Sequence, residues 1–516
     1  MGAPASGSVA SGRISDVIRS PRLSGPVAWT AGVGFISVLY MGIVVPLGLA
    51  PDETEHAFRA YQLSLGHLFP QVVDCFTHRH LLPCHGRLVG HLLPKRRAGG
   101  ELSYALVRVL NGLYGASHSN GMLTHFHPRA YTRVLDVALG GPAMAFAHFE
   151  NTALYSPVNY APATLVLWIA RQAAEPVVAS LFAARLLTGM VWLTLVTAAV
   201  ALAPRWKWLF ALVLLVPTAL SQGAAISADS AALGVVALAV AYALNLADRG
   251  GLVRDGEVAL MAVLGVVIGL MKFPLVLVLA AVLALLFEVL GKGRARSVRV
   301  LAIAGPGAAA SVLWNLASNA YFVPYRNVVY DQAQRAYISQ PGQEHYLLTH
   351  FYDIPAILWQ TAVGGKLFEW RGVVGTVGEM GLPEWFGIAW LVLFVILAAA
   401  SIEGAGPSRA ARRWVGGTLL TYVLATLLAL YLTWSSVGAS EISGMHGRYV
   451  TLVLVLAIPL LAGIGTRHVR ISPRVTAGTV MALSLASALA MCFYTSSYYY
   501  GQSPWTAFAN VISVLF

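Results

Sequence analysis

Four ionisable side chains gather near the start of the chain. They are Asp52, Glu53, Glu55 and His56. Carboxylates are common general bases, and a neighbouring histidine can share a proton or a ligand with them. The cluster follows an apolar stretch, 27–50, which carries no charged residue and is long enough to cross a bilayer as a helix. We therefore expect chemistry on a substrate at the lipid boundary.

Local structure offers a simpler role for these acids. A helix that begins at Glu53 would use Asp52 as its cap, and acids in its first turn would complement the helix dipole. On such a helix Asp52 and His56 share a face, whereas Glu53 points elsewhere. We expect Glu55 to be solvated. Because the chain has no His-Glu-x-x-His pair, a zinc protease is not expected.

Composition indicates a membrane protein. Of 516 residues, 57% are hydrophobic and 11% are charged, and the mean hydropathy is +0.69. Soluble proteins carry about 25% charged residues, so lipid must solvate much of this chain. The net charge of +12 comes from short basic clusters between apolar runs rather than from one basic stripe. This distribution argues against a nucleic-acid partner.

The apolar runs predict an all-α polytopic fold. Basic clusters occupy every second loop, which places them in the cytoplasm with the amino terminus and leaves the carboxy terminus outside. The weakest point is Met271-Lys272-Phe273-Pro274, where two short spans almost touch. About eleven spans are predicted, at 27–48, 179–203, 208–224, 227–247, 257–271, 273–290, 298–320, 385–401, 414–434, 448–465 and 475–495.

Outside these spans the chain has a tail and two large outer segments. Residues 1–25 are expected to form a disordered cytoplasmic tail, and 26–516 a single transmembrane domain. The outer segments are 49–178 and 321–384. Interfacial helices are expected at 104–115 and at 158–174, in the first outer segment. The alternative is that 158–174 crosses the membrane as a twelfth span.

Cysteines are sparse. Cys75 and Cys84 lie in the first outer segment, in a compartment that permits oxidation, so a disulfide is one interpretation. Metal binding by these cysteines and nearby histidines is another, although the spacing fits no standard zinc pattern. Cys492 is interpreted as a small buried hydrophobe.

Several motifs together resemble a known family. The segment 51–70, PDETEHAFRAYQLSLGHLFP, is followed in order by a Ser-Pro-x-x-Tyr-x-Pro motif at 156–162, by Ser-Ala-Asp-Ser at 227–230, by Leu-Met-Lys-Phe-Pro at 270–274 and by Gly-Arg-Tyr at 447–449. The set resembles a bacterial multi-pass membrane family of unknown function, placed by similarity among the GT-C glycosyltransferases. Two positions depart from its usual pattern, Thr54 for proline and His446 for glutamine.

The resemblance implies an inverting glycosyltransferase of the bacterial plasma membrane, with an extracytoplasmic active site. Such enzymes move a sugar from a polyprenyl-phosphate donor to a cell-envelope glycan or lipid acceptor. By this resemblance Asp52 is the general base and Glu53 a second catalytic acid. A divalent cation bound by Asp52, Glu53 and His56 is an open alternative, because some GT-C enzymes use one.

Positive charge is needed where the phosphate leaves. The candidates are Lys272, which is the best of them, Arg448 and Arg59. The alternatives are interfacial anchoring for Lys272 and Arg448, and pairing with an acid for Lys272 and Arg59. The substrate-binding candidates are His56, Tyr61, Tyr160 and Asp229. For the tyrosines the alternative is an aromatic belt, and for Asp229 it is helix capping.

Two other functional classes stay open. A transporter or flippase of an envelope precursor would also place ionisable groups near the lipid boundary, but we find no internal repeat typical of transporters. A structural scaffold would give the acidic motif no purpose. The long first outer segment favours the enzyme.

Overall fold

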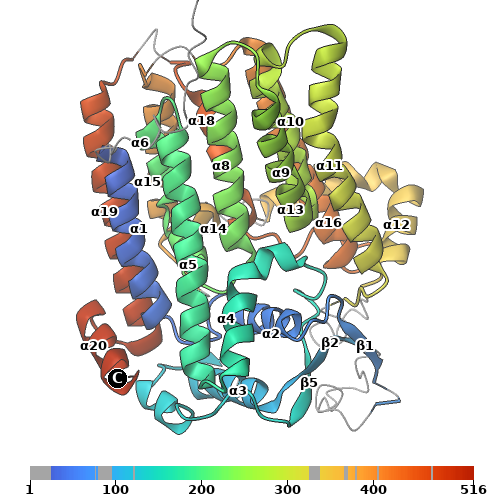
Figure 1. Ribbon diagram of the computed structural model, residues 1–516, viewed down its shortest axis with the longest axis vertical. Coiled ribbons are helices and arrows are strands. Elements are labelled where there is room, and N and C mark those ends of the chain that lie inside the picture. The colour runs from blue at the N-terminus through green and yellow to red at the C-terminus, as the bar shows by residue number, and fades with distance from the viewer. Residues whose placement is uncertain are drawn as a thin grey trace, which may run out of the picture.

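Helices make up most of the chain in the computed structural model, which describes residues 25–75, 77–78, 96–119, 122–324, 338–364, 370–377, 380–403, 406–465 and 469–515. The long helices stand side by side, and a smaller layer of short helices and strands lies at the lower end of the molecule (Figure 1). The predicted tail, 1–25, lies outside the described residues except for Gly25.

In the described part of the chain, six helices are long and apolar enough to cross a membrane. They correspond to six of the predicted spans, so the prediction of about eleven is wrong. The six are α1 (Gly25–Val44), α5 (Val177–Leu202), α8 (Ala228–Arg249), α11 (Gly293–Asn319), α16 (Arg409–Thr433) and α19 (Pro473–Tyr500).

The other five predicted spans are short or interrupted helices. Pro217 separates α6 from α7, and Pro274 follows the break between α9 and the 3-10 turn η5. Proline at the start of a helix is favoured, but within a continuous helix it removes a hydrogen bond. The shorter elements are α6 (Lys207–Leu214), α7 (Pro217–Gly223), α9 (Asp255–Met271), η5 (Phe273–Leu277), α10 (Val278–Leu286), η6 (Phe287–Val289), α15 (Glu384–Ala400), α17 (Arg448–Thr451), η8 (Leu454–Leu456), α18 (Ala457–Leu461) and α20 (Pro504–Leu515).

The first outer segment contains strands that the all-α prediction missed. A three-stranded antiparallel sheet has the order β1-β2-β5, and Gly99 of β2 pairs with both neighbours. A side chain on Gly99 would meet the Ala147 carbonyl oxygen at 1.9 Å, so only glycine permits this approach. The segment comprises α2 (Glu53–Ser64), β1 (Gln71–Asp74), β2 (Arg96–Ser103), α3 (Tyr104–Ser117), β3 (His118–Ser119), β4 (Met122–Leu123), η3 (Pro128–Arg133), β5 (Met144–His148), η4 (Pro157–Tyr160) and α4 (Ala161–Gln172).

Helices α3 and α4 lie at the two positions where interfacial helices are predicted. Helix α4 has 12 residues, too few to cross a bilayer. The re-entrant or interfacial interpretation of 158–174 therefore fits better than a twelfth span. Cys75 is buried and disulfide-bonded, whereas Cys84 lies outside the described residues.

The described part of the second outer segment is also mainly helical. Its helices pack beside the end of α16 and around α17. They are α12 (Gln340–Thr349), η7 (Phe351–Asp353), α13 (Ile354–Val363) and α14 (Trp370–Gly375), with the short strands β6 (Thr376–Val377) and β7 (Met380–Gly381).

Close packing of glycines fixes α9 against α11. A methyl group on Gly269 would meet the Gly307 carbonyl oxygen at 2.1 Å, and one on Gly307 would meet the Gly265 carbonyl oxygen at 2.4 Å. Small residues allow helix backbones to approach this closely. The carboxyl end of α9, and Lys272 directly after it, are thereby held in place.

Candidate active site

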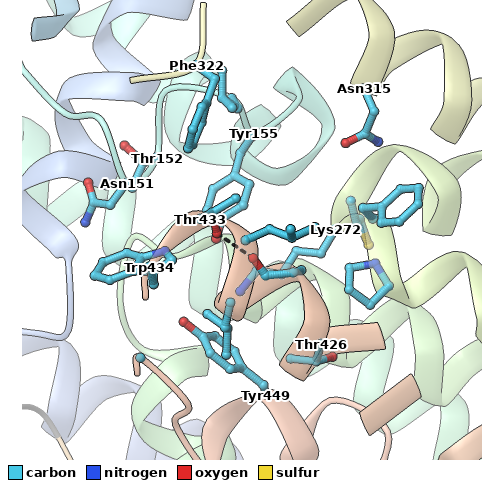
Figure 2. A pocket seen from close by; sticks show the side chains of 18 of the residues that line it. Asn151, Thr152, Tyr155, Lys272, Asn315, Phe322, Thr426, Thr433, Trp434 and Tyr449 are labelled. Carbon is cyan, nitrogen blue, oxygen red and sulfur yellow. Dashed lines mark hydrogen bonds between the residues drawn. The ribbon is translucent and has the colours of Figure 1, made fainter. Parts of the chain in front are cut away.

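A cavity of about 470 Å³ lies where several helix ends meet. The start of α2, α8 and α17 and the end of α9, α11 and α16 all contribute to it, together with the loop after β5. Basic residues of the predicted loops lie at the other ends of these helices, for example Arg249 at the end of α8 and Lys292 before α11. The polar and aromatic lining includes Asp52, His56, Asn151, Thr152, Tyr155, Asp229, Lys272, Asn315, Phe322, Trp434, Arg448 and Tyr449. Figure 2 shows part of this lining, with Asn151, Tyr155, Lys272 and Tyr449 among the labelled residues.

Asp52 faces this cavity rather than capping its helix. It occupies the cap position of α2 in the left-handed conformation, with φ 57°, and makes no side-chain cap hydrogen bond. Its carboxylate accepts hydrogen bonds from Arg448 Nη2 and, at 3.1 Å, from Asn151 Nδ2. The side chain is still 36% exposed. A strained backbone that presents a reachable carboxylate is typical of a functional site.

The charge of Arg448 controls the protonation state of Asp52. Burial alone would raise the pKa of the Asp52 carboxyl, but the Arg448 guanidinium outweighs it and lowers this pKa to about 2. Asp52 is therefore ionised at neutral pH. While Asp52 is paired with Arg448, its carboxylate is a poor acceptor of protons.

Asp229 and Lys272 form a second ion pair in the same cavity. Ser227 Oγ accepts a hydrogen bond of 3.1 Å from the Asp229 amide and caps α8, which leaves the Asp229 carboxylate for Lys272. The ammonium group of Lys272 lies 5.3 Å from the ring centroid of Tyr155 and 4.9 Å from that of Tyr449. Figure 2 shows Lys272 between these two rings. Aromatic faces stabilise a cation at such distances.

Arg448 links the two pairs and has donors to spare. Its Nε lies 3.8 Å from Asp229 Oδ2, beyond hydrogen-bonding distance. Within the described residues, Nε and Nη1 are buried and have no hydrogen-bond partner. Buried unsatisfied donors are costly, and an anion in the cavity would satisfy them.

His56 lines the cavity as a neutral group. Burial lowers the pKa of its imidazole to about 4. Its Nδ1 lies 2.7 Å from the Tyr160 hydroxyl, and Tyr160 is itself buried behind the cavity wall. Tyr160 therefore orients His56 from outside the cavity lining.

Three predicted site residues lie elsewhere. Glu53 is 2% exposed and bonds Arg185, so it is not positioned for catalysis. Arg59 is fully buried; its guanidinium bonds the Gln62 side chain and the carbonyl oxygens of Leu68 and Tyr155, at 2.8 and 3.0 Å. Tyr61 is 2% exposed, in the apolar core. None of the three lines the cavity.

The three predicted metal ligands do not converge. Asp52 bonds Arg448, Glu53 bonds Arg185 and His56 contacts Tyr160. In the described part of the chain, no three His, Cys, Asp or Glu side chains form a group that could bind a metal ion. Consecutive residues on a helix diverge, which explains why Asp52 and Glu53 cannot share a ligand.

Near the cavity, sequence patterns missed Asn151 and gave the wrong environment for Glu55. Asn151 contacts Asp52 from the loop after β5, and its Oδ1 is buried without a hydrogen-bond partner in the described chain. Glu55 is partly buried rather than solvated. Burial, and then the charge of Asp52, raise the pKa of Glu55 to about 7. No local motif marks Asn151, and the burial of Glu55 depends on parts of the chain that local patterns do not show.

The helices and the cavity define a multi-pass membrane protein with a charged site at its helix ends. Residues 127–457 match the family described as "Predicted membrane protein (DUF2142)", and the chain belongs to this family. The match includes Asp229, Lys272 and Arg448, whereas Asp52 precedes it. No curated protein and no solved structure matches the chain.

Proposed function

We propose that this protein is an inverting membrane glycosyltransferase of the GT-C type, which uses a polyprenyl-phosphate sugar. The observation that carries the proposal is the placement of Asp52 beside Arg448 and Lys272 around one cavity. A carboxylate and two cations are the groups needed to deprotonate a hydroxyl and to stabilise a departing phosphate.

Each group has a defined task in the proposed reaction. The acceptor hydroxyl oxygen attacks the anomeric carbon and its proton passes to Asp52. The bond between that carbon and the phosphate oxygen breaks, and the phosphate keeps the electron pair. Lys272 and Arg448 stabilise the second negative charge that develops on the phosphate. Attack opposite the leaving group inverts the anomeric centre.

The apolar lining supports a lipid-linked donor. Phe273 and Leu428 line the cavity and are 53% and 50% exposed, so its mouth borders apolar surface between η5 and α16. An isoprenoid chain could lie there while its phosphate reaches Lys272. The cavity lies at the helix ends opposite Arg249 and Lys292 of the basic clusters. By the positive-inside rule we propose that it is extracytoplasmic, where an envelope glycan or lipid could serve as acceptor.

Sugar transfer by the purified protein tests the proposal. The protein is incubated with polyprenyl-phosphate sugars and envelope acceptors, and release of polyprenyl phosphate is measured. We expect Asp52→Asn to insert and fold but to lose transfer by at least about a hundredfold, the usual contribution of a general base. Asp248→Asn is the matched control, since Asp248 also pairs with an arginine, at 2.6 Å, and is 34% exposed.

Two outcomes would refute the proposal. Full activity of Asp52→Asn would exclude Asp52 as the base. Movement of a lipid-linked precursor across the membrane without sugar transfer would favour the transporter or flippase instead. Mass-spectrometric detection of a co-purifying polyprenyl phosphate would support the enzyme.

A further inference from the structure

The contact between Asp52 and Arg448 conflicts with the role of Asp52 as a base. A carboxylate bonded to a guanidinium has little affinity for a proton. Arg448 is meanwhile 8% exposed, with two buried nitrogens that have no hydrogen-bond partner among the described residues. In this arrangement, therefore, each partner is held away from the task that the reaction requires.

We propose that the donor phosphate displaces Asp52 from Arg448, so that donor binding both fills the anion site and releases the base. This inference rests on the proposed function and adds the order in which its steps occur. Donor must bind before the acceptor hydroxyl can be deprotonated. Without donor, Asp52 stays paired and does not activate water or a stray hydroxyl.

The geometry of the guanidinium supports displacement. Asp52 accepts from Nη2 of Arg448. A guanidinium presents two edges that bind a phosphate through two parallel donors, and Nη2 belongs to both edges. A phosphate bound by either edge must therefore share Nη2 with Asp52. Repulsion between the two anions then favours withdrawal of the carboxylate, which is joined to the chain by a single methylene.

Charge balance around the cavity points the same way. Asp52 and Asp229 offset Lys272 and Arg448, so the four groups have no net charge when all are ionised. A phosphodiester donor adds one negative charge, and this favours a proton on Asp52. Transfer then places the acceptor proton on Asp52 and the second charge on the phosphate. The net charge of groups and ligands is unchanged by the step.

Binding of farnesyl phosphate to the full-length protein in detergent tests the displacement. Affinity is measured by calorimetry, with inorganic phosphate and farnesol as separate probes of the head group and the chain. Because Asp52 competes with the ligand for Arg448, we expect Asp52→Asn to bind farnesyl phosphate about tenfold more tightly than the wild type, equivalent to about 1.4 kcal/mol. Arg448→Gln should weaken binding by a similar factor.

Two control variants distinguish displacement of Asp52 from a general change in the electrostatic field of the cavity. Glu150→Gln also removes a carboxylate that lines the cavity, but Glu150 pairs with His148 at 3.0 Å and Arg97 at 3.5 Å rather than with Arg448. Asp248→Asn removes an ion pair with Arg205 instead. Displacement predicts little change in affinity for either control.

The outcomes distinguish this inference from the proposed function. If the wild type binds farnesyl phosphate but Asp52→Asn binds it equally or more weakly, displacement is wrong and the glycosyltransferase proposal stands. Equal tightening in Glu150→Gln would also overturn displacement. If neither wild type nor variants bind farnesyl phosphate, the lipid-phosphate donor itself is refuted. Binding of inorganic phosphate as tight as that of farnesyl phosphate would point to free phosphate as the ligand.

Discussion

Replacing Glu53 with alanine should destabilise the fold rather than impair the chemistry alone. Glu53 Oε1 accepts hydrogen bonds from Arg185 Nε at 2.6 Å and from the Ile226 amide at 3.1 Å, and Oε2 accepts one from the Gly48 amide at 3.0 Å. Arg185 in turn donates to the Val45 carbonyl oxygen at 2.6 Å. This network ties the end of α1 to α5 and to the start of α8.

The expected loss follows from the burial of both partners. The side chains of Arg185 and Glu53 are 1% and 2% exposed, so removal of the carboxylate leaves a buried cation with no counter-ion. Breaking one partner of a buried ion pair costs about 3–5 kcal/mol. The two freed amides add about 1 kcal/mol or more each if no water replaces the carboxylate.

Thermal unfolding of the purified protein measures this loss of stability. The readout is the fraction of protein that remains monodisperse after heating. We expect Glu53→Ala to lower the unfolding temperature by several degrees. The double variant Glu53→Gln with Arg185→Met removes both charges and should recover part of the stability. A Glu53→Ala protein with wild-type stability but no sugar transfer would refute this reasoning and return Glu53 to the catalytic group.

Two further predictions concern Glu55 and Lys272. The pKa of Glu55 is about 7 in the folded protein and near 4.5 ordinarily. The protonated carboxyl therefore contributes its full stability below pH 4.5, and this contribution is lost as the pH rises through 7. Glu55→Gln should therefore gain about 1–3 kcal/mol over the wild type between pH 4.5 and 8, and parallel unfolding curves at both pH values would contradict this. Lys272→Met should weaken farnesyl phosphate binding about tenfold and destabilise the fold, because buried Asp229 loses its hydrogen-bonded cation and keeps only Arg448, 3.8 Å away. Adding Asp229→Asn should restore stability but not affinity, and recovery of both would exclude Lys272 as a phosphate ligand.

The two cations of the cavity that the sequence indicated share one property. Lys272 and Arg448 are cations at positions where apolar neighbours or the outer face make a charge expensive, and the structure brings both to the cavity with Asp52 and Asp229. Arg59 met the same criterion but bonds backbone carbonyl oxygens in the core. Charge in an unfavourable place indicates a partner, but it does not tell whether that partner is a ligand or the chain itself.

Other features depended on information that local patterns do not hold. Hydropathy reports apolar composition, so it could not show that the predicted span 208–224 breaks before Pro217, or that six helices are long enough to cross a membrane. Strand β2, with the sequence RRAGGELS, lacks the alternation typical of a strand, and Gly99 is explained only by its close approach to β5. Asn151 contacts Asp52 across 99 positions of the chain.

The left-handed backbone at Asp52 also limits which residues the chain can accept there. Aspartate, asparagine and glycine tolerate this conformation best, and most longer or branched side chains do not. In a mutational survey of this position, the ability of a residue to adopt the left-handed conformation should therefore decide first whether it is tolerated, and its charge second. Glutamate would keep the charge but lose the conformation, so the depth of the carboxylate in the cavity is set by the main chain as much as by the side chain.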